Sequence, residues 1–361
     1  MMRVSPLADP PWLWVVSTLG VLLICTACAM VGCQTSRKDL NNYDTADTAD
    51  TADASDSDDE PDTSDTSTET AEQRCIGSGP WVSVSAGYNG SCGIHPDGCI
   101  ECWTATDTGA WTSRIDETGW YGQTGNLVPP DGEYSSVDLG RCAGWGTHTC
   151  AIRQLDGGID CWGSDAWRAA SAPPGVWMAV SLGEDDGCAL GTSGRIGCWG
   201  RYIGAGDSAS YSLAADYVAV SNCDWIVCGL ASDGRADCWQ VGLPDDVWSY
   251  PGPWTAVTTD WHPEIFGVTP EGELSATLGS SFLPDPPSPA GDLCVTGLDE
   301  GGCVLDIDGN VYCSQTLQPV PDGTFTSLTC GGIPVCGTTV DGQILCWGDC
   351  RYGRCDVPVH E

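Results

Sequence analysis

The sequence predicts an all-β protein, a seven-bladed β-propeller that follows a signal segment and a disordered acidic linker. Two observations predict this fold. A hairpin motif recurs in seven copies, and a short β-type segment precedes each copy. The 47 glycines and 23 prolines in 361 residues also suit short strands joined by many turns. We expect the signal in residues 1–33, the linker in 34–74 and the propeller in 75–361.

The first 33 residues are typical of an export signal, because Arg3 precedes an apolar run. The letters MVGC, ending at Cys33, resemble the cleavage box of bacterial lipoproteins, and CTAC, ending at Cys28, is the alternative. The resemblance implies a lipidated Cys33 on an exported chain, held at the outer membrane or the cell surface. Plain secretion and an uncleaved anchor are the alternatives, since about 20 apolar residues span a bilayer.

Residues 34–74 are acidic, of low complexity and almost free of large apolar side chains. Such a segment cannot bury enough surface to fold, and its like charges extend it, so we expect a flexible tether. The formal net charge of the whole chain is −37, and Lys38 is its single lysine. This charge argues against nucleic acid as a partner, because binding phosphates requires Lys and Arg. Any membrane contact would come through the lipid anchor only.

The hairpin motif is clearest in VCGLASDGRADCWQ, residues 227–240. Its Asp-Gly pair predicts a three-residue turn that ends at Gly234. That turn places Cys228 directly opposite Cys238 on the paired strands. Facing residues bring their Cβ atoms to about 4.5–5.5 Å, close to the separation of about 3.5–4.5 Å in a disulfide. The spacing therefore predicts a disulfide across the hairpin, with two buried thiols as the alternative.

The motif recurs with its cysteines in five further copies. The predicted pairs are Cys92 with Cys102, Cys150 with Cys161, Cys188 with Cys198, Cys303 with Cys313, and Cys336 with Cys346. In the remaining copy, FGVTPEGELSATL, both cysteines are replaced, by Phe266 and Ala276. The joint loss is what a bonded pair predicts, and it favours disulfides over independent thiols.

The remaining cysteines also favour an oxidising compartment. Cys350 and Cys355 share one short loop and are a candidate pair. Six others have no assignable partner, because six cysteines allow fifteen connectivities: Cys75, Cys99, Cys142, Cys223, Cys294 and Cys330. Zinc is the competing interpretation, but no CxxC pair faces another. We expect no metal and no cofactor.

A β-type segment precedes each hairpin and completes the repeat as three strands. Most copies read aromatic, two small residues, then a β-branched residue: 81–84, 134–137, 177–180, 217–220 and 254–257, with looser copies at 292–295 and 325–328. Seven copies favour a closed ring, because closure leaves few exposed strand edges. We expect the first strand, near Trp81, to dock beside the C-terminal segment 347–358 and complete one blade.

The unit DGCALGTSGRIGCWG, and the segments WYGQTGNLVP and WGDCRYGRCDVP, resemble the repeat of the regulator of chromosome condensation family. The repeat also resembles that of a secreted propeller β-lactamase-inhibitor protein. The resemblance covers about residues 75–361 and implies a seven-bladed propeller that binds partners through one face. The paired cysteines imply an exported version, and the fifth copy departs from the pattern because it lacks both cysteines and its Trp.

Candidate chemistry is sparse. The letters DIDGN at 306–310 start like a calcium loop but fall on a hairpin turn, and four histidines lack metal-ligand spacing. We therefore expect no catalytic residues and a non-catalytic binding module of the cell envelope with a protein partner. The candidate contacts are an insertion at 104–131 and four Trp outside the repeat phase: Trp111, Trp120, Trp145 and Trp261. The alternatives are a glycan or peptide hydrolase or lyase with carboxylates at the propeller mouth, and a structural surface protein.

Overall fold

The computed structural model describes residues 79–88, 90–104, 123–124, 128–141, 146–163, 169–203, 209–212, 214–260, 264–277, 283–296, 301–332, 334–350 and 353–359. They all lie in one compact unit, Thr68–Glu361. The expected lipidation sites Cys28 and Cys33 and the expected linker 34–74 lie outside the described residues. No helix among the described residues is long and apolar enough to cross a membrane.

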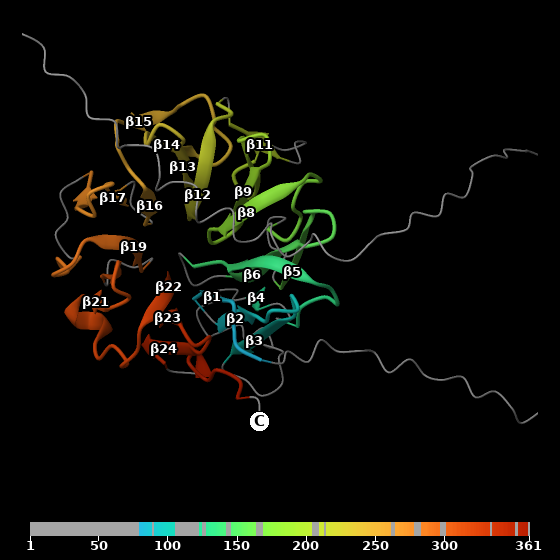
Figure 1. Ribbon diagram of the computed structural model, residues 1–361. Helices are drawn as coiled ribbons and strands as arrows, with labels where there is room; N and C mark the ends of the chain where they lie inside the picture. Colours follow the sequence, from blue (N-terminus) through green and yellow to red (C-terminus); the bar gives the residue numbers. More distant parts are fainter. Residues whose placement is uncertain are drawn as a thin grey trace, which may run out of the picture. The chain divides into compact units, whose positions relative to one another are not determined.

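The described part of the unit forms seven sheets arranged around a ring (Figure 1). We call the sheets blades 1 to 7 in chain order. Their first strands are β1 (Ser83–Ala86), β5 (Tyr134–Leu139), β8 (Trp177–Leu182), β12 (Tyr217–Cys223), β16 (Ala256–Thr259), β19 (Ala290–Val295) and β22 (Phe325–Cys330). Each first strand contacts those of the neighbouring blades, and β22 contacts β1, which closes the ring.

The second and third strands of each blade form the predicted hairpin. The second strands are β2 (Gly90–Ile94), β6 (Gly146–Arg153), β9 (Asp186–Gly191), β13 (Ile226–Ala231), β17 (Ile265–Val268), β20 (Gly302–Asp306) and β23 (Pro334–Thr339). The third strands are β3 (Ile100–Thr104), β7 (Ile159–Gly163), β10 (Ile196–Gly200), β14 (Ala236–Gln240), β18 (Leu274–Ala276), β21 (Val311–Cys313) and β24 (Ile344–Gly348). Further elements are β4 (Gln123–Thr124), β11 (Ser210–Tyr211), β15 (Trp248–Tyr250) and the 3-10 turn η2 (Gln315–Leu317).

The hairpin register agrees with the prediction from the spacing. Cys228 faces Cys238, and Gly234 at the turn has φ of +85°. The six predicted hairpin pairs are all disulfides, with Cα atoms 4.0–4.1 Å apart: Cys92–Cys102, Cys150–Cys161, Cys188–Cys198, Cys228–Cys238, Cys303–Cys313 and Cys336–Cys346. In blade 5 Phe266 faces Ala276 at the same place, so a fully buried ring takes the position of a disulfide.

Six other predicted or unassigned cysteines are also disulfide-bonded. Cys350 bonds Cys355, and Cys294 of blade 6 bonds Cys330 of blade 7. Cys99 and Cys223 are disulfide-bonded as well. Cys75 and Cys142 lie outside the described residues. Disulfides at this density are typical of a chain that folds in an oxidising compartment.

The turn glycines do more than reverse the chain. In every blade, the backbone N–H at the aromatic position, which Ala290 occupies in blade 6, donates a hydrogen bond to the carbonyl of the turn glycine of the preceding blade, at 2.6–3.1 Å. The seven bonds run from Trp81 to Gly342, Tyr134 to Gly98, Trp177 to Gly157, Tyr217 to Gly194, Trp254 to Gly234, Ala290 to Gly272 and Phe325 to Gly309. We call them the turn latches. They join all seven junctions, including the closing one between blades 7 and 1.

The ring closes differently from the expectation. Every strand of blade 1 comes from the first copy and every strand of blade 7 from the last, so the described residues form no sheet shared by both ends. The closure is made by packing and by single bonds. Trp81 and Trp103 pack with Cys336 and Ile344, and the indole N–H of Trp103 donates to the carbonyl of Arg354 at 3.1 Å.

The sixth copy is offset from the sequence prediction by two residues. The pattern puts Asp292 at the aromatic position, but Ala290 makes the latch and pairs with Asp306 as Trp177 pairs with Gly191. The cause is a longer connection between β19 and β20. The sequence prediction counted residues back from Cys303, and it therefore placed the start of the first strand two residues too late.

Candidate binding surfaces

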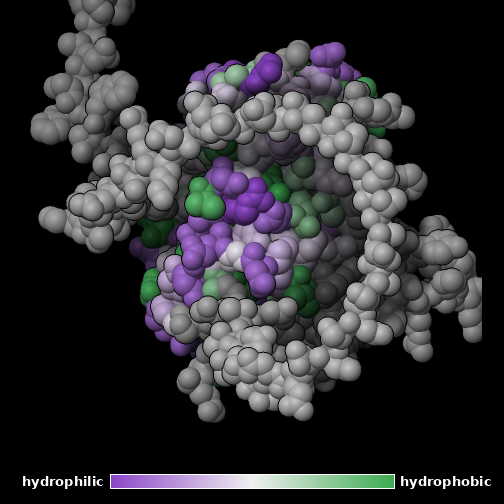
Figure 2. Space-filling view, turned by 90° about the vertical axis from the view of Figure 1, so that its right-hand side faces the viewer, coloured by the Kyte–Doolittle hydropathy of each residue, from purple (hydrophilic) through white to green (hydrophobic). Residues whose placement is uncertain are grey.

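One face of the ring carries most of the recurring exposed apolar side chains. We call it the turn face, and define it by the seven turn glycines and the beginnings of the first strands. Seven large apolar residues, 53–94% exposed, lie there: Val82, Leu155, Val176, Met178, Val218, Ile307 and Val340. In the side shown in Figure 2, hydrophilic described residues gather near the centre, and hydrophobic ones are scattered among them. Exposed apolar groups that gather on one face are typical of an interaction surface.

These apolar residues occupy repeated positions. Val82, Met178 and Val218 directly follow the aromatic residue of their blades, whereas Ile307 and Val340 lie at turn tips. In six of the seven turns the residue before the glycine is acidic: Asp97, Asp156, Asp233, Glu271, Asp308 and Asp341. The face therefore presents apolar groups among carboxylates.

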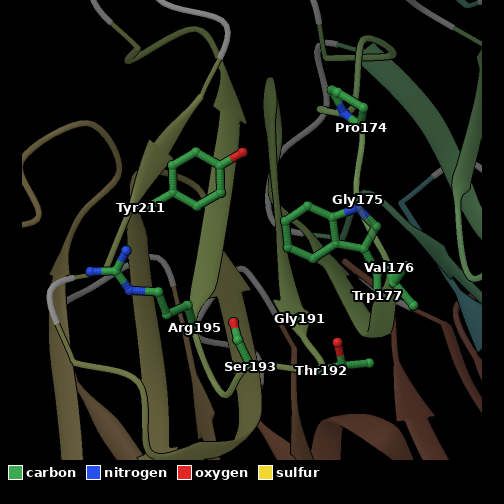
Figure 3. A pocket seen from close by; sticks show the side chains of 9 residues that line it. All are labelled: Pro174, Gly175, Val176, Trp177, Gly191, Thr192, Ser193, Arg195 and Tyr211. Atoms are coloured by element: carbon green, nitrogen blue, oxygen red, sulfur yellow. The ribbon is translucent and has the colours of Figure 1, made fainter.

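A pocket of about 450 Å³ opens on the turn face of blade 3 (Figure 3). Its walls are residues 174–177, the turn region 191–193, Arg195 and Tyr211. Trp177 of β8 and Tyr211 of the outer strand β11 lie on opposite sides of the opening. The turn here carries Ser193 in the position that is acidic in the other blades. This pocket lies within the size range of ligand sites.

The centre of the ring holds a smaller polar cavity of about 190 Å³, lined by first strands of blades 2 to 7. In each blade, one residue of the first strand pairs with the first cysteine of the hairpin, or with Phe266 in blade 5. These residues are Ser85, Asp138, Ser181, Ser221, Thr258, Cys294 and Thr329. We call these seven residues the central ring. All but Ser85 line the cavity.

The central ring ties neighbouring blades together. At five junctions its side chain accepts a bond from a backbone N–H of the following blade. These bonds run from Leu139 to Ser85, Leu182 to Asp138, Asn222 to Ser181, Thr259 to Ser221, and Ala86 to Thr329, at 2.7–3.3 Å. Between blades 6 and 7 the Cys294–Cys330 disulfide takes this place. Between blades 5 and 6, the buried hydroxyl of Thr258 makes no hydrogen bond.

Three ionisable side chains line this cavity: Asp138, Arg141 and Asp292. Arg141 extends from blade 2 to blade 4, where it donates to the Ser221 hydroxyl at 2.8 Å and to the carbonyl of Asn222 at 3.2 Å. Burial raises the pKa of Asp138, although Arg141 and the hydroxyl of Ser85 partly offset the effect. Asp138 uses both carboxylate oxygens, one for Ser85 and one for Leu182 N–H.

Asp292 is the second carboxyl at the cavity. Burial raises its pKa to about 6, and a hydrogen bond from its neighbour Leu293 N–H, 2.8 Å long, lowers it only partly. The side chain lies on the side of β19 that faces blade 7, because Cys294, two residues further, bonds Cys330 there. With its pKa near 6, this carboxyl loses its proton about two pH units above an ordinary Asp.

Acidic residues also gather away from the turn face, in the connection between β8 and β9. Asp186 is fully buried and accepts from the Asn222 amide at 2.8 Å, and burial raises its pKa well above the usual range. Asp185 pairs with Arg201 at 3.1 Å. Within the described part of the chain, no three Asp, Glu, His or Cys side chains are arranged to hold a metal ion.

The predicted contact residues lie outside this description. The residues outside the description are most of the insertion 104–131 and the four Trp residues Trp111, Trp120, Trp145 and Trp261. The calcium-like letters at 306–310 form a turn, in which one Asp306 oxygen accepts from the N–H groups of Asp308 and Asn310. Sequence reasoning missed the central ring, although its signal was present. A Ser or Thr follows the aromatic residue by four positions in five blades.

No family of known proteins and no curated protein matches the chain. Among solved structures, the ectodomain of the receptor kinase CR4 from Physcomitrella patens is similar, with a TM-score of 0.56 and 18% identity over 75% of this chain and 74% of that chain. The CRINKLY WD40 ectodomain of the Arabidopsis thaliana receptor kinase ACR4 has a TM-score of 0.55 and 18% identity, over 75% of this chain and 99% of that chain. At this identity the likeness concerns the fold alone. Together with the seven sheets, it shows that the protein is a β-propeller.

Proposed function

We propose that this chain is a non-catalytic binding module that recognises a protein partner through the turn face of its propeller. The observation that supports this best is the set of exposed apolar residues at repeated positions on that face. Burying such residues against a partner is favourable, at about 25 cal/mol per Å² of apolar surface removed from water. The two propellers of similar fold are ectodomains of receptor kinases, which supports a binding role outside the cell.

The proposed place of action is the cell envelope. The disulfides suit export, the MVGC box suits lipidation at Cys33, and residues 34–74 have the composition of a tether. In this proposal the lipid holds the chain at the outer membrane or cell surface, and the tether presents the propeller to its partner. Secretion without a lipid is the alternative.

The hydrolase or lyase alternative has less support. It needs a pair of carboxylates available to a substrate, and the cavity at the ring centre offers Asp138 and Asp292. Both oxygens of Asp138 are already hydrogen-bonded within the ring. This use of Asp138 favours a structural role for it over proton transfer.

Affinity capture with matched baits tests the proposed binding face. The full chain, folded under oxidising conditions, is used beside a variant with Val82→Ser, Met178→Ser and Val218→Ser. A control variant carries Leu243→Ser and Val247→Ser, which change exposed apolar residues beyond the other end of β14. We expect a saturable envelope partner that binds the native chain and the control equally and loses at least tenfold in affinity with the first variant. A partner that binds all three baits alike, or no partner at all, would overturn the proposal.

A further inference from the structure

The pocket in blade 3 differs in charge from the rest of the turn face. Six turns carry an acidic residue before the glycine, and blade 3 alone has a neutral one, Ser193. None of the nine residues that line the pocket is acidic, although the chain has 50 Asp and Glu. Arg195 follows the turn and lines the same pocket. An anionic group approaching the turn face would meet the least repulsion here.

The walls of the pocket are apolar and its floor is polar. A Cβ atom at Gly197 would lie 2.8 Å from Trp177 and 2.8 Å from Tyr211, so each ring comes close to this glycine. Tyr211 is 44% exposed and Val176 is 55% exposed, which leaves apolar surface within reach of a ligand. In Figure 3 the hydroxyl of Ser193 points toward the space between the two rings, and the hydroxyl of Thr192 lies below Trp177.

The outer strand β11 makes this site special to blade 3. It pairs with β10, with Tyr211 facing Gly197, and so places an aromatic ring opposite Trp177. Among the described residues, only blade 4 has another antiparallel strand at this position, β15. There Tyr250 faces Ala236 instead, and the adjacent turn carries Asp233.

We propose that this pocket receives an apolar segment of the protein partner that carries a carboxylate, either an acidic side chain or a chain end. The inference rests on the proposed function, because it specifies the partner of the same face. The aromatic and aliphatic walls would bury the apolar group. The hydroxyls of Thr192 and Ser193 and the guanidinium of Arg195 would donate to the carboxylate, and hydrogen bonds to charged acceptors are stronger than neutral ones.

The test uses one substitution that the fold already accepts elsewhere. Ser193→Asp gives blade 3 the acidic turn that six sister blades carry, so it changes the charge at the pocket with little risk to folding. The probe is a fluorescein-labelled peptide, Gly-Ser-Gly-Phe-Leu-Glu, bound to the full oxidised chain and followed by fluorescence anisotropy. Matched probes replace the Glu by Gln and the terminal carboxylate by an amide. Asp233→Ser, the reverse change in blade 4, is the control variant.

We expect the acidic probe to bind, to lose at least tenfold in affinity with Ser193→Asp, and to be unchanged by Asp233→Ser. The neutral probe should bind weakly to all three chains. Equal binding of acidic and neutral probes, or an acidic probe insensitive to Ser193→Asp, would overturn the inference. Displacement of the acidic probe by a neutral oligosaccharide but not by free carboxylates would overturn it in favour of a carbohydrate site. A capture experiment that still depends on Val82, Met178 and Val218 would then leave the proposed function standing.

Discussion

Blades 4 and 5 are neighbouring copies of one repeat, yet they are stabilised in different ways. Blade 4 has the Cys228–Cys238 disulfide, and its central-ring Ser221 accepts a bond from Thr259 of blade 5. Blade 5 has Phe266 in place of its first cysteine, and the hydroxyl of Thr258 makes no bond to blade 6. Among the described residues, the junction between blades 5 and 6 is thus the one central-ring junction with neither a hydrogen bond nor a disulfide.

This difference separates the interactions that set the geometry of the ring from those that add stability to it. Blade 5 keeps both of its turn latches, from Trp254 to Gly234 and from Ala290 to Gly272, although it lacks the disulfide. Its apolar residues also pack with those of blade 6 around Phe266. Latches and apolar packing therefore suffice to set the geometry of a blade, and disulfides and central-ring bonds add stability to it.

The closing latch offers the most severe test of this view. In Gly342→Ala the new Cβ would lie 2.3 Å from the Cβ of Pro80, at a residue whose φ is +75°. Backbone strain and overpacking together should cost about 4 kcal/mol of unfolding free energy. Chemical denaturation under oxidising conditions measures it. Gly291→Ala is the control, because its nearest neighbour would lie 3.7 Å away. Equal losses in both variants would mean that the latch does not hold the ring.

The titration of Asp292 tests blade 6, which is one of the two blades at the unbonded junction. Its pKa is about 6 in the folded chain, above the usual 3.8, because burial disfavours the charge. The folded chain therefore binds a proton more tightly than the unfolded chain does. The resulting stability is present below about pH 4 and is lost as the pH rises through about 6.

We expect this carboxyl to make the protein about 2 kcal/mol less stable at pH 8 than at pH 4, relative to Asp292→Asn. Denaturation of both chains across this range, with the exposed Asp308→Asn as control, measures the difference. A pH dependence that is the same with and without Asp292 would show that the carboxyl is well hydrated in the cavity.

The parts of the fold that could be predicted from the sequence are local. The register of a hairpin depends on the length of its turn, so the spacing of Cys228 and Cys238 was enough to predict their disulfide. The number of blades followed from the repeat. The bond between Cys294 and Cys330 joins two blades, and no spacing along the chain reports the distance between sheets. The sequence prediction placed Asp292, instead of Ala290, at the aromatic position of blade 6. The cause is that counting residues back from Cys303 cannot detect a longer connection between the first and second strands.

The candidate sites were less predictable for the same reason. The pocket in blade 3 needs Tyr211 to come opposite Trp177, and this placement depends on an outer strand of two residues that has no repeat signal. The acidic turns, in contrast, were visible in the sequence. Their significance as a ring on one face, with Ser193 as the neutral exception, requires the blades to be placed in space.

The smallest expected effects come from substitutions in the central ring, which compare the junction between blades 4 and 5 with the junction between blades 5 and 6. Ser221→Ala removes an acceptor from the N–H of Thr259 and from the guanidinium of Arg141, and should cost about 1 kcal/mol. Thr258→Val removes a buried hydroxyl that makes no hydrogen bond, and should be neutral or slightly stabilising. Thermal denaturation of the two variants under the same oxidising conditions measures both. If Thr258→Val costs as much as Ser221→Ala, the two junctions are bonded alike in solution. If only Ser221→Ala is costly, the junction between blades 5 and 6 is held by its latch and its apolar contacts alone.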